Sequence, residues 1–335
     1  MEKQGITVCG TALMDVIKPV ESYPAEGCLA NIDSISYASG GALCNVLLGL
    51  HKLDPDMPLA AIGVIGNDSI GDRTMNALSQ AKTCDFSGIR RAGIGSFSDV
   101  YQSHRSKQRT FFHCKGANSL LNRADFNVDS IHSKILYIGY IQLLDALDAE
   151  EEEYGTELAH LLHDIWQKGI ETAIDMVGEQ SNRIQKIGPP SLKYCTYCII
   201  NEEEAERLTG IPLKDSNGNI IRSALEDALR KIKDFGVSKW AIIHSPKLSA
   251  GMDENFRIHY QKSPDLPADY IVGTVGAGDA FCSGVLYSAY HAQNLQYALQ
   301  AGTAAACCSL AAAGANEGMK TMQECFSQLT RLSGE

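Results

Sequence analysis

Gly273-Thr274-Val275-Gly276-Ala277-Gly278-Asp279 is followed directly by a run of small and apolar residues, 280–286. Glycines one residue apart allow a tight turn that exposes backbone N–H groups, and a helix beginning there adds unpaired amides and the positive end of its dipole. The stretch therefore predicts an anion site with Asp279 at its edge. Phosphoryl transfer uses both parts, because amides hold developing charge while a carboxylate accepts the proton of a hydroxyl. An ordinary strand-to-helix turn with an early acidic residue has the same pattern, so both interpretations stay open here.

Short apolar runs typical of strands alternate with helical patterns along most of the 335 residues. The clearest helix is predicted at 221–235, where apolar residues recur on one face and Gly236 follows as a stop. This alternation predicts an α/β fold with a mostly parallel sheet, helices on both faces, and ligands at the carboxyl ends of the strands. The predicted strands are 6–9, 59–65, 135–138, 172–174, 198–200 and 240–243.

Two segments, 13–39 and 97–115, interrupt the alternation. They lack helical periodicity and are typical of short antiparallel strands joined by turns. We expect them to form a small sheet that acts as a lid on a single domain spanning 1–335. A closing lid suits a kinase, because it excludes the water that would otherwise hydrolyse ATP.

Basic residues recur at odd positions of the second lid segment. On a strand such residues share one face, which predicts a basic surface for an anionic ligand, either ATP phosphate or a charged substrate. Charges that protect a solvated edge strand would give the same pattern. The residues are Arg105, Lys107, Arg109, His113 and Lys115.

Three further motifs combine glycine, amide and carboxylate groups. Gly40-Gly41 opens a helical run and allows close approach of a ligand to the backbone, with Asn45 near the first turn. Residues 201–204, Asn-Glu-Glu-Glu, follow a predicted strand and suit Mg²⁺ held through water, although an acidic helix cap looks the same. The spacing does not choose among the three glutamates. For most of the glycine-punctuated turn 63–72 we expect a structural role.

Composition and missing motifs exclude several classes. The net charge of −11 argues against a nucleic-acid or membrane-surface binder. Eleven irregularly spaced cysteines and an N-terminus without a signal pattern predict reduced thiols in the cytoplasm, and no apolar run is long enough to span a bilayer. No Walker-type loop, G-x-G-x-x-G fingerprint or G-x-S-x-G elbow occurs, which argues against the corresponding nucleotide, dinucleotide and hydrolase sites.

Taken together, the motifs resemble those of the ribokinase-like (PfkB-type) carbohydrate kinases. The resemblance covers about residues 5–325, and its C-terminal signature is the most specific part. Five motifs stand in the family's order: the sugar-binding segment at 10–15, the N-terminal signature at Gly40-Gly41 with Asn45, the glycine motif at 63–68, Asn-x-x-Glu at 201–204 and the C-terminal signature at 274–279.

This resemblance implies a ribokinase-like three-layer sandwich with a β-lid that phosphorylates a hydroxyl with MgATP. Asp279 is implied as the base, with an anion hole formed by Gly276, Ala277 and Gly278. The residues implied to hold the substrate are Asp15, Gly41, Asn45 and, from the lid, Arg109. Asn201 and Glu204 are implied to organise Mg²⁺ through water, and the other implied nucleotide contacts are His244, Thr274, Gly278 and, beside the adenine, Asn316.

The position of Asp279 also predicts its acidity. At a helix N-terminus its pKa should be low, which makes it a weak base, and a loose transition state tolerates this because the proton can leave late. We expect Asp279→Asn to lose at least ~10²-fold in turnover, the usual contribution of a general base.

Two positions depart from the family's pattern. Gly273 stands where the family usually has an Asp that helps to bind an activating monovalent cation, which argues against potassium activation. The segment 244–251 replaces a shorter glycine-containing turn that contacts the nucleotide in many members. Pro246 removes a backbone donor there, and His244 or Lys247 is the expected replacement contact.

The leading prediction is ATP-dependent phosphorylation of a hydroxyl on a sugar or sugar derivative. The basic lid residues favour a sugar acid or another anionic acceptor. A nucleoside kinase is the main alternative, and a non-catalytic sugar- or nucleotide-binding regulatory protein is the other. Exposed lid strands, which often pair in this family, also predict a homodimer. The aromatic residues in or near the lid that would stack on a nucleoside base are Phe97, Tyr101, Phe111 and Phe112.

Overall fold

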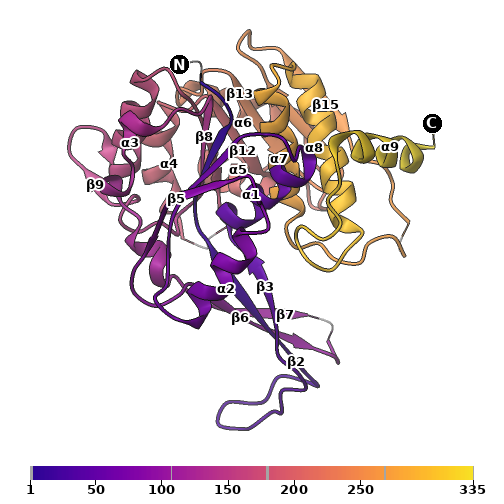
Figure 1. Ribbon diagram of the computed structural model, residues 1–335. Helices are drawn as coiled ribbons and strands as arrows, with labels where there is room; N and C mark the ends of the chain where they lie inside the picture. Colours follow the sequence, from indigo (N-terminus) through magenta and orange to yellow (C-terminus); the bar gives the residue numbers. More distant parts are fainter. Residues whose placement is uncertain (1–2, 107, 179–180, 268, 335) are drawn as a thin grey trace.

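Residues along the central strands are buried alternately against two different sets of helices. In β8 (Ile135–Ile141), Leu136 and Ile138 belong to one apolar cluster, whereas Ile135 and Tyr137 belong to another. Side chains alternate between the faces of a strand, so this run requires cover on both sides of its sheet. The computed structural model, which describes residues 3–106, 108–178, 181–267 and 269–334, provides that cover as a three-layer α/β sandwich (Figure 1). The predicted fold class is confirmed.

The middle layer is one sheet with the strand order β15-β14-β13-β12-β11-β8-β1-β4-β5. Pairing is parallel from β13 to β5, and β14 and β15 extend the sheet in antiparallel pairing. All six predicted strands are present, whereas β5, β14 and β15 lack a continuous apolar run and were not predicted. The bounds are β1 Ile6–Gly10, β4 Leu59–Ile65, β5 Asp85–Arg91, β11 Glu171–Met176, β12 Tyr197–Asn201, β13 Trp240–His244, β14 Leu248–Met252 and β15 Ile258–Lys262.

The helices divide between the two faces of this sheet. One cluster of buried side chains joins it to α3, α4, α5 and α6, and a second joins it to α1, α7 and α8, with α9 packed on α8. The predicted helix 221–235 is α6, and Gly236 follows it with a φ of 122°. The bounds are α1 Ala42–Leu53, α2 Ser69–Leu78, α3 Glu157–Gln167, α4 Ile184–Leu192, α5 Glu202–Thr209, α6 Arg222–Asp234, α7 Ala277–Tyr290, α8 Leu295–Leu310 and α9 Met322–Ser333.

Short elements complete the body of the molecule. Three 3₁₀ turns follow one another between β7 and β8: η1 (Gly116–Leu120), η2 (Arg123–Asp125) and η3 (Val128–Ser130). A small hairpin pairs β9 (Glu150–Glu151) with β10 (Gly155–Thr156). None of the helices in the described residues is long and apolar enough to cross a membrane. All eleven cysteines are free in this structure.

The two predicted lid segments form a separate four-stranded sheet, which we call the lid sheet. It consists of β2 (Leu13–Val20), β3 (Ser36–Gly40), β6 (Phe97–Ser103) and β7 (Arg109–Cys114) in the order β3-β2-β6-β7, and it projects from the body (Figure 1). Its outer pairs are antiparallel as predicted, but the central pair β2–β6 is parallel because the chain passes through the body between them.

The predicted basic face of the lid is wrong in its extent. Strand β7 begins only at Arg109, so Arg105 lies in the preceding turn, and Lys115 follows the strand with helical φ and ψ of −59° and −37°. Arg109 and His113 keep the predicted alternation, and Lys107 lies outside the described residues. A turn has replaced the first part of the expected strand, which removes the common face.

Candidate active site

The glycine turn before α7 is closed against a neighbouring loop. Gly276 is the N-cap of α7 and has a φ of 76°, a conformation that favours glycine. A Cβ added to Gly276 would lie only 2.3 Å from Ala315 Cβ, so glycine is required by space as well as by conformation. The first turn of the helix, with Ala277 and Gly278, therefore starts at a fixed place, where its amides and dipole favour an anion.

Asp279 lies in this first turn and is only 7% exposed. Both of its carboxylate oxygens accept hydrogen bonds: Tyr140 Oη donates to Oδ1 at 2.5 Å, and Asn45 Nδ2 donates to Oδ2 at 2.8 Å. Asn45 in turn accepts a hydrogen bond on Oδ1 from Asn316 Nδ2 at 3.4 Å. The carboxylate is thus held by the sheet on one side and by α1 on the other.

The predicted low pKa of Asp279 is wrong. Burial raises the pKa of this carboxyl above its ordinary value, and the hydrogen bonds from Tyr140 and Asn45 offset only part of that rise. The helix dipole is a local effect, whereas the desolvation comes from the packing of β8 and α1 around the side chain. Asp279 is therefore a stronger base than the sequence alone indicated.

Asn45 is placed by the start of α1, where a second glycine is required. Gly41 is the N-cap with a φ of 86°, and a Cβ on it would lie 2.5 Å from the carbonyl oxygen of Thr11. Thr11 takes over the capping role, because its Oγ1 accepts from Ala42 N at 3.0 Å and its carbonyl oxygen accepts from Leu43 N at 2.9 Å. The end of β1 therefore sets the direction of the helix that carries Asn45.

The lid sheet carries Asp15 on β2, directly across from Ser98 on β6. Burial raises the pKa of Asp15 to about 6, against the lowering effects of the Arg109 charge and of a hydrogen bond from Ser98. Ser98 Oγ also lies 3.0 Å from Nδ1 of His113, its neighbour on β7. The predicted substrate residues Asp15 and Arg109 are thus brought together on one face of the lid sheet.

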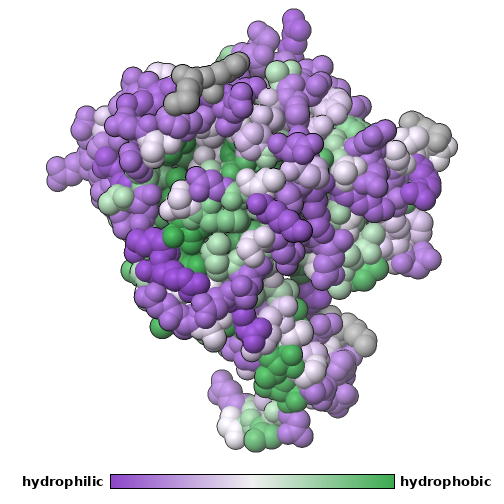
Figure 2. Space-filling model, in the orientation of Figure 1, coloured by the Kyte–Doolittle hydropathy of each residue, from purple (hydrophilic) through white to green (hydrophobic). Residues whose placement is uncertain are grey.

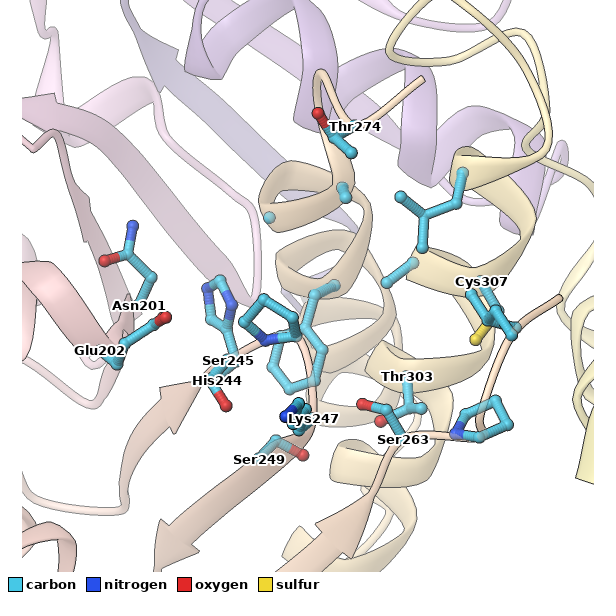
Figure 3. A pocket seen from close by; sticks show the side chains of 18 of the residues that line it. Asn201, Glu202, His244, Ser245, Lys247, Ser249, Ser263, Thr274, Thr303 and Cys307 are labelled. Atoms are coloured by element: carbon cyan, nitrogen blue, oxygen red, sulfur yellow. The ribbon is translucent and has the colours of Figure 1, made fainter. Parts of the chain in front are cut away.

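A cleft of about 590 Å³ opens where β12 and β13 end, and helices α7 and α8 form its other side (Figure 3). Figure 3 shows Asn201 and His244 on one side of it and Thr303 and Cys307 of α8 on the other. Predicted nucleotide residues line this cleft: Asn201, His244, Lys247, Thr274 and Gly278. Apolar side chains of α7 and α8 also line it: Ala277, Phe281, Cys307 and Leu310.

His244 is the last residue of β13 and lies beside the start of α7. Its ring stacks on Phe281 with centroids 4.7 Å apart and an interplanar angle of 28°. A Cβ on Gly278 would lie 3.4 Å from His244 Cε1, which puts the imidazole beside the first turn of α7. Burial lowers the pKa of His244 to about 4, so the ring is neutral at pH 7 and offers a hydrogen bond rather than a charge.

Asn201 and Glu204 form the cap of α5. Asn201 Oδ1 accepts from the backbone N–H groups of Glu203 and Glu204 at 2.9 Å each, and Glu204 Oε2 accepts from Asn201 N at 2.9 Å. This is the capping interpretation left open by the sequence. Glu204 is also buried, and burial together with the Asp279 charge raises its pKa to about 8 despite its hydrogen bonds with Asn201.

Sequence reasoning missed two residues of this centre, Tyr140 and Asp175. Asp175 lies near the end of β11, is 6% exposed and accepts a hydrogen bond from Tyr137 Oη at 3.3 Å. Burial and the charges of Glu204 and Asp279 raise the pKa of Asp175 well above its ordinary value. The predicted strands end at 138 and 174, just before these two residues. Had the strands been predicted to continue further, both residues would have been placed at the site.

Three other sequence-based expectations can be compared with the structure. Asn316 is not among the residues that line this cleft: its side chain reaches Asn45 and its carbonyl oxygen accepts from Lys52 Nζ at 2.6 Å. Its place beside the adenine stays a prediction. Gly273 has no room for the family's Asp, since a Cβ there would lie 2.8 Å from the carbonyl oxygens of Ala312 and Ala313. In the turn 63–72, Asp68 has a structural role, because its side chain caps α2.

Comparisons with known proteins agree with this geometry. The family model of the pfkB family of carbohydrate kinases matches residues 3–322. The chain therefore belongs to the pfkB family and is a carbohydrate kinase. A search of the curated proteins found no significant match.

Solved structures show the same fold over nearly the whole chain. A structure of Arabidopsis thaliana ribokinase with ribose and ATP has a TM-score of 0.81 at 20% identity and covers 98% of this chain and 99% of its own. A Cryptococcus neoformans ribokinase with ADP has a TM-score of 0.78 at 14% identity, covering 98% and 100%. A Methanocaldococcus jannaschii nucleoside kinase has a TM-score of 0.73 at 16% identity, covering 99% and 100%. The ribokinase-like fold is confirmed.

Proposed function

We propose that this pfkB-family kinase transfers the γ-phosphoryl group of ATP to a hydroxyl of a sugar or sugar derivative, with Asp279 as the general base. The observation that carries the proposal is the position of Asp279. Its carboxylate stands in the first turn of α7, next to the amides of the glycine turn, and both of its oxygens are held by hydrogen bonds. A base beside an anion site is the arrangement that phosphoryl transfer requires.

In the proposed step, the acceptor oxygen forms a bond to the γ-phosphorus while the bond between that phosphorus and the bridging oxygen of ADP breaks. The acceptor O–H proton passes to Asp279, and the leaving ADP carries the electron pair of the broken bond. Gly276, Ala277 and Gly278 supply the anion hole for the transferring group. The raised pKa of Asp279 improves its match to an acceptor proton at neutral pH.

The cleft beside α7 is the proposed ATP site. Apolar side chains of α7 and α8 suit the adenine, whereas His244, Thr274 and Lys247 are the polar groups nearest the glycine turn. Neutral His244 would act as a hydrogen-bond donor to a phosphate oxygen, and the exposed Lys247 would supply a positive charge. These two side chains support the expectation that the segment with Pro246 keeps a nucleotide contact.

Mg²⁺ fits the donor set beside this cleft. Asn201 borders the cleft, and the buried carboxyl of Glu204 carries a pKa raised by burial and by neighbouring acidic charge, a condition that a cation would relieve. We propose that Asn201 and Glu204 hold the ion through water, while retaining their role as a helix cap. When bound, Mg²⁺ supplies charge neutralisation for the β- and γ-phosphates.

On the acceptor side, we propose that Asp15, Gly41 and Asn45 bind sugar hydroxyls and that the lid sheet closes over them within a single domain. Arg109 shares a face with Asp15 through the register of β2, β6 and β7, which favours an acceptor with an anionic group. The same register favours a sugar over a nucleoside. Of the four candidate stacking residues, Phe111 alternates onto the Asp15 face, whereas the other three alternate onto the opposite one: Phe97, Tyr101 and Phe112.

Pairing of two lid sheets is part of the proposal. Figure 2 shows apolar side chains on the projecting lid, where Leu29 is 85% exposed and Phe112 is 62% exposed. Burial of such residues against a second copy would remove them from water and cover the free strand edges. We also propose a cytoplasmic location, supported by eleven free cysteines, and no nucleic-acid or membrane partner for so acidic a chain.

The testing experiment incubates the protein with MgATP and a panel of D-ribose, D-fructose, D-gluconate, 2-keto-3-deoxygluconate, myo-inositol and adenosine. Products are followed by mass. A phosphorylated sugar or sugar acid that is absent with Asp279→Asn supports the proposal, whereas a phosphorylated adenosine favours the nucleoside alternative. Thermal stabilisation by a panel member without any ADP formation would indicate a binding protein built on a kinase fold.

A further inference from the structure

Tyr140 makes a contact with Asp279 that the proposed reaction does not yet use. Its hydroxyl donates to Oδ1, from the sheet, while Asn45 donates to Oδ2 from α1. We propose that Tyr140 is a positioning residue of this kinase, which holds the Asp279 carboxylate in the orientation that receives the acceptor proton. The inference rests on the proposed role of Asp279 as the base.

The backbone before Tyr140 is fixed by contacts that only glycine allows. Thr11 N donates to the carbonyl oxygen of Gly139 at 2.7 Å, and a Cβ on Gly10 would lie 1.7 Å from that oxygen. A Cβ on Gly139 itself would lie 2.6 Å from Tyr137 Oη and 2.9 Å from Ala42 Cβ. The end of β8 therefore packs closely between β1 and the start of α1, and this packing fixes the position of the Tyr140 side chain.

Two hydrogen bonds from opposite sides restrict the rotation of the Asp279 carboxylate. Each carboxylate oxygen has two lone pairs, and Tyr140 and Asn45 each use one. Rotation about the Cβ–Cγ bond would break both contacts, so the remaining lone pairs keep their direction before an acceptor binds. Positioning of this kind lowers the barrier because the reacting groups need no reorganisation.

Tyr140 stays a donor over the working pH range. Burial and the Asp279 charge raise the pKa of the Tyr140 hydroxyl well above its ordinary value. The hydroxyl therefore keeps its proton, and it is the donor in its hydrogen bond with Asp279. That hydrogen bond in turn opposes the rise that burial causes in the pKa of Asp279. Other titratable groups that interact electrostatically with Asp279 come from α1, β8, β11, α5 and α7: Cys44, Tyr137, Asp175, Glu204 and Cys282.

The test is Tyr140→Phe, which removes the hydroxyl and keeps the ring. We expect the acidic limb of the pH profile of kcat to move up by about one pH unit, because ionised Asp279 loses a charge-assisted hydrogen bond. At pH 7 we expect kcat to fall about 10-fold, with KM for both substrates within about twofold, because the lost contact acts in the transition state. The assay uses MgATP and the panel member that the wild type phosphorylates.

A second measurement needs no acceptor. Carboxyl ¹³C resonances of aspartate-labelled protein are titrated, and Asp279→Asn identifies the Asp279 signal. Tyr140→Phe should raise the midpoint of that signal, whereas Tyr260→Phe, which removes a hydroxyl of β15 that is bonded to Glu226, should leave it unchanged. In the Asp279→Asn background, Tyr140→Phe should cause no further loss of kcat.

The outcomes separate the two proposals. Wild-type kcat and a wild-type Asp279 midpoint in Tyr140→Phe would overturn the role of Tyr140. An equal loss of kcat with and without Asp279 would also overturn it, because the effect would then be independent of the base. Wild-type turnover in Asp279→Asn would instead overturn the proposed function, whatever Tyr140→Phe does.

Discussion

The centre around Asp279 and the face of the lid sheet around Asp15 are built in opposite ways. In the centre, Gly41 and Gly276 have no space for a Cβ, and Asp279 and Asn45 are 7% and 4% exposed. On the lid sheet, Asp15 is half-buried and Arg109 at the start of β7 is exposed. The geometry for the proposed chemical step is therefore present before a ligand binds, whereas the proposed recognition of the acceptor would involve an exposed side chain with freedom to move.

The electrostatics of the two regions differ in the same way. Burial dominates at Asp279, where neutral hydrogen-bond donors are the partners. At Asp15, the charge of Arg109 also acts, and the pKa settles at about 6. Changes in the centre should consequently alter kcat, whereas changes on the lid sheet should alter KM for the acceptor.

Asp279→Asn should have the largest effect of all. The amide keeps the size of the side chain but cannot accept the acceptor proton, so we expect kcat to fall at least ~10²-fold while the dissociation constant of the acceptor changes much less. The matched control is Asp72→Asn, which neutralises an acidic residue in the first turn of α2 and should keep wild-type kcat. Steady-state kinetics and acceptor titration measure both, and near-wild-type turnover in Asp279→Asn would contradict the assignment.

Gly276→Ala tests whether the anion hole depends on close packing. Gly276 and Gly218 have nearly equal φ values of 76° and 78°, but a Cβ on Gly218 meets no atom within 4 Å. Both substitutions carry the strain of positive φ, about 1 kcal/mol, and only Gly276→Ala must also displace Ala315. We expect about 10-fold or more loss of kcat for Gly276→Ala and a further destabilisation of about 1–3 kcal/mol relative to Gly218→Ala.

Denaturant unfolding and kinetics of these two variants give the comparison. Equal stability and equal kcat in Gly276→Ala and Gly218→Ala would mean that the turn relaxes freely and that the centre is not rigid in the proposed sense.

Arg109→Ala tests the lid sheet. Because the Arg109 charge lowers the pKa of Asp15, its removal should raise that pKa above about 6. Ionised Asp15 would then be lost at a higher pH as the solution is acidified, and KM for the acceptor should rise about 10-fold near pH 6.5 with little change in kcat. Arg105→Ala, which removes a charge from the neighbouring turn, is the control and should leave KM unchanged. A loss confined to kcat would assign Arg109 to the chemical step instead.

The features that could be predicted from the sequence are those that depend on residues close together in the chain. Glycine turns followed by apolar runs predicted the starts of α1 and α7, and continuous apolar runs predicted the six central strands, because each strand is buried on both faces. The lid segments were predicted from their lack of helical periodicity.

The features that could not be predicted depend on contacts between distant residues. The hydrogen bond from Tyr140 to Asp279 joins positions 139 residues apart, and no local pattern marks either partner for the other. For the same reason the predicted low pKa of Asp279 failed, since the desolvation that outweighs the helix dipole arises from elements elsewhere in the chain. The predicted basic face failed because alternation in the sequence does not reveal where a turn ends and a strand begins.

The smallest effect is expected for monovalent cations, at the edge of the rigid centre. The family's Asp at the position of Gly273 would have to occupy space that lies 2.8 Å from the carbonyl oxygens of Ala312 and Ala313. This chain therefore lacks both the side-chain ligand and the room for it. We expect equal kcat in potassium chloride and tetramethylammonium chloride at the same ionic strength, which keeps the screening of exposed charges constant. Gly273→Asp should lose stability without gaining potassium dependence, because the backbone of that loop fills the place of the added carboxylate. Activation of the wild type by potassium alone would show that backbone carbonyls suffice for the cation, and that the packing around Gly273 opens more readily than the packing around Gly276.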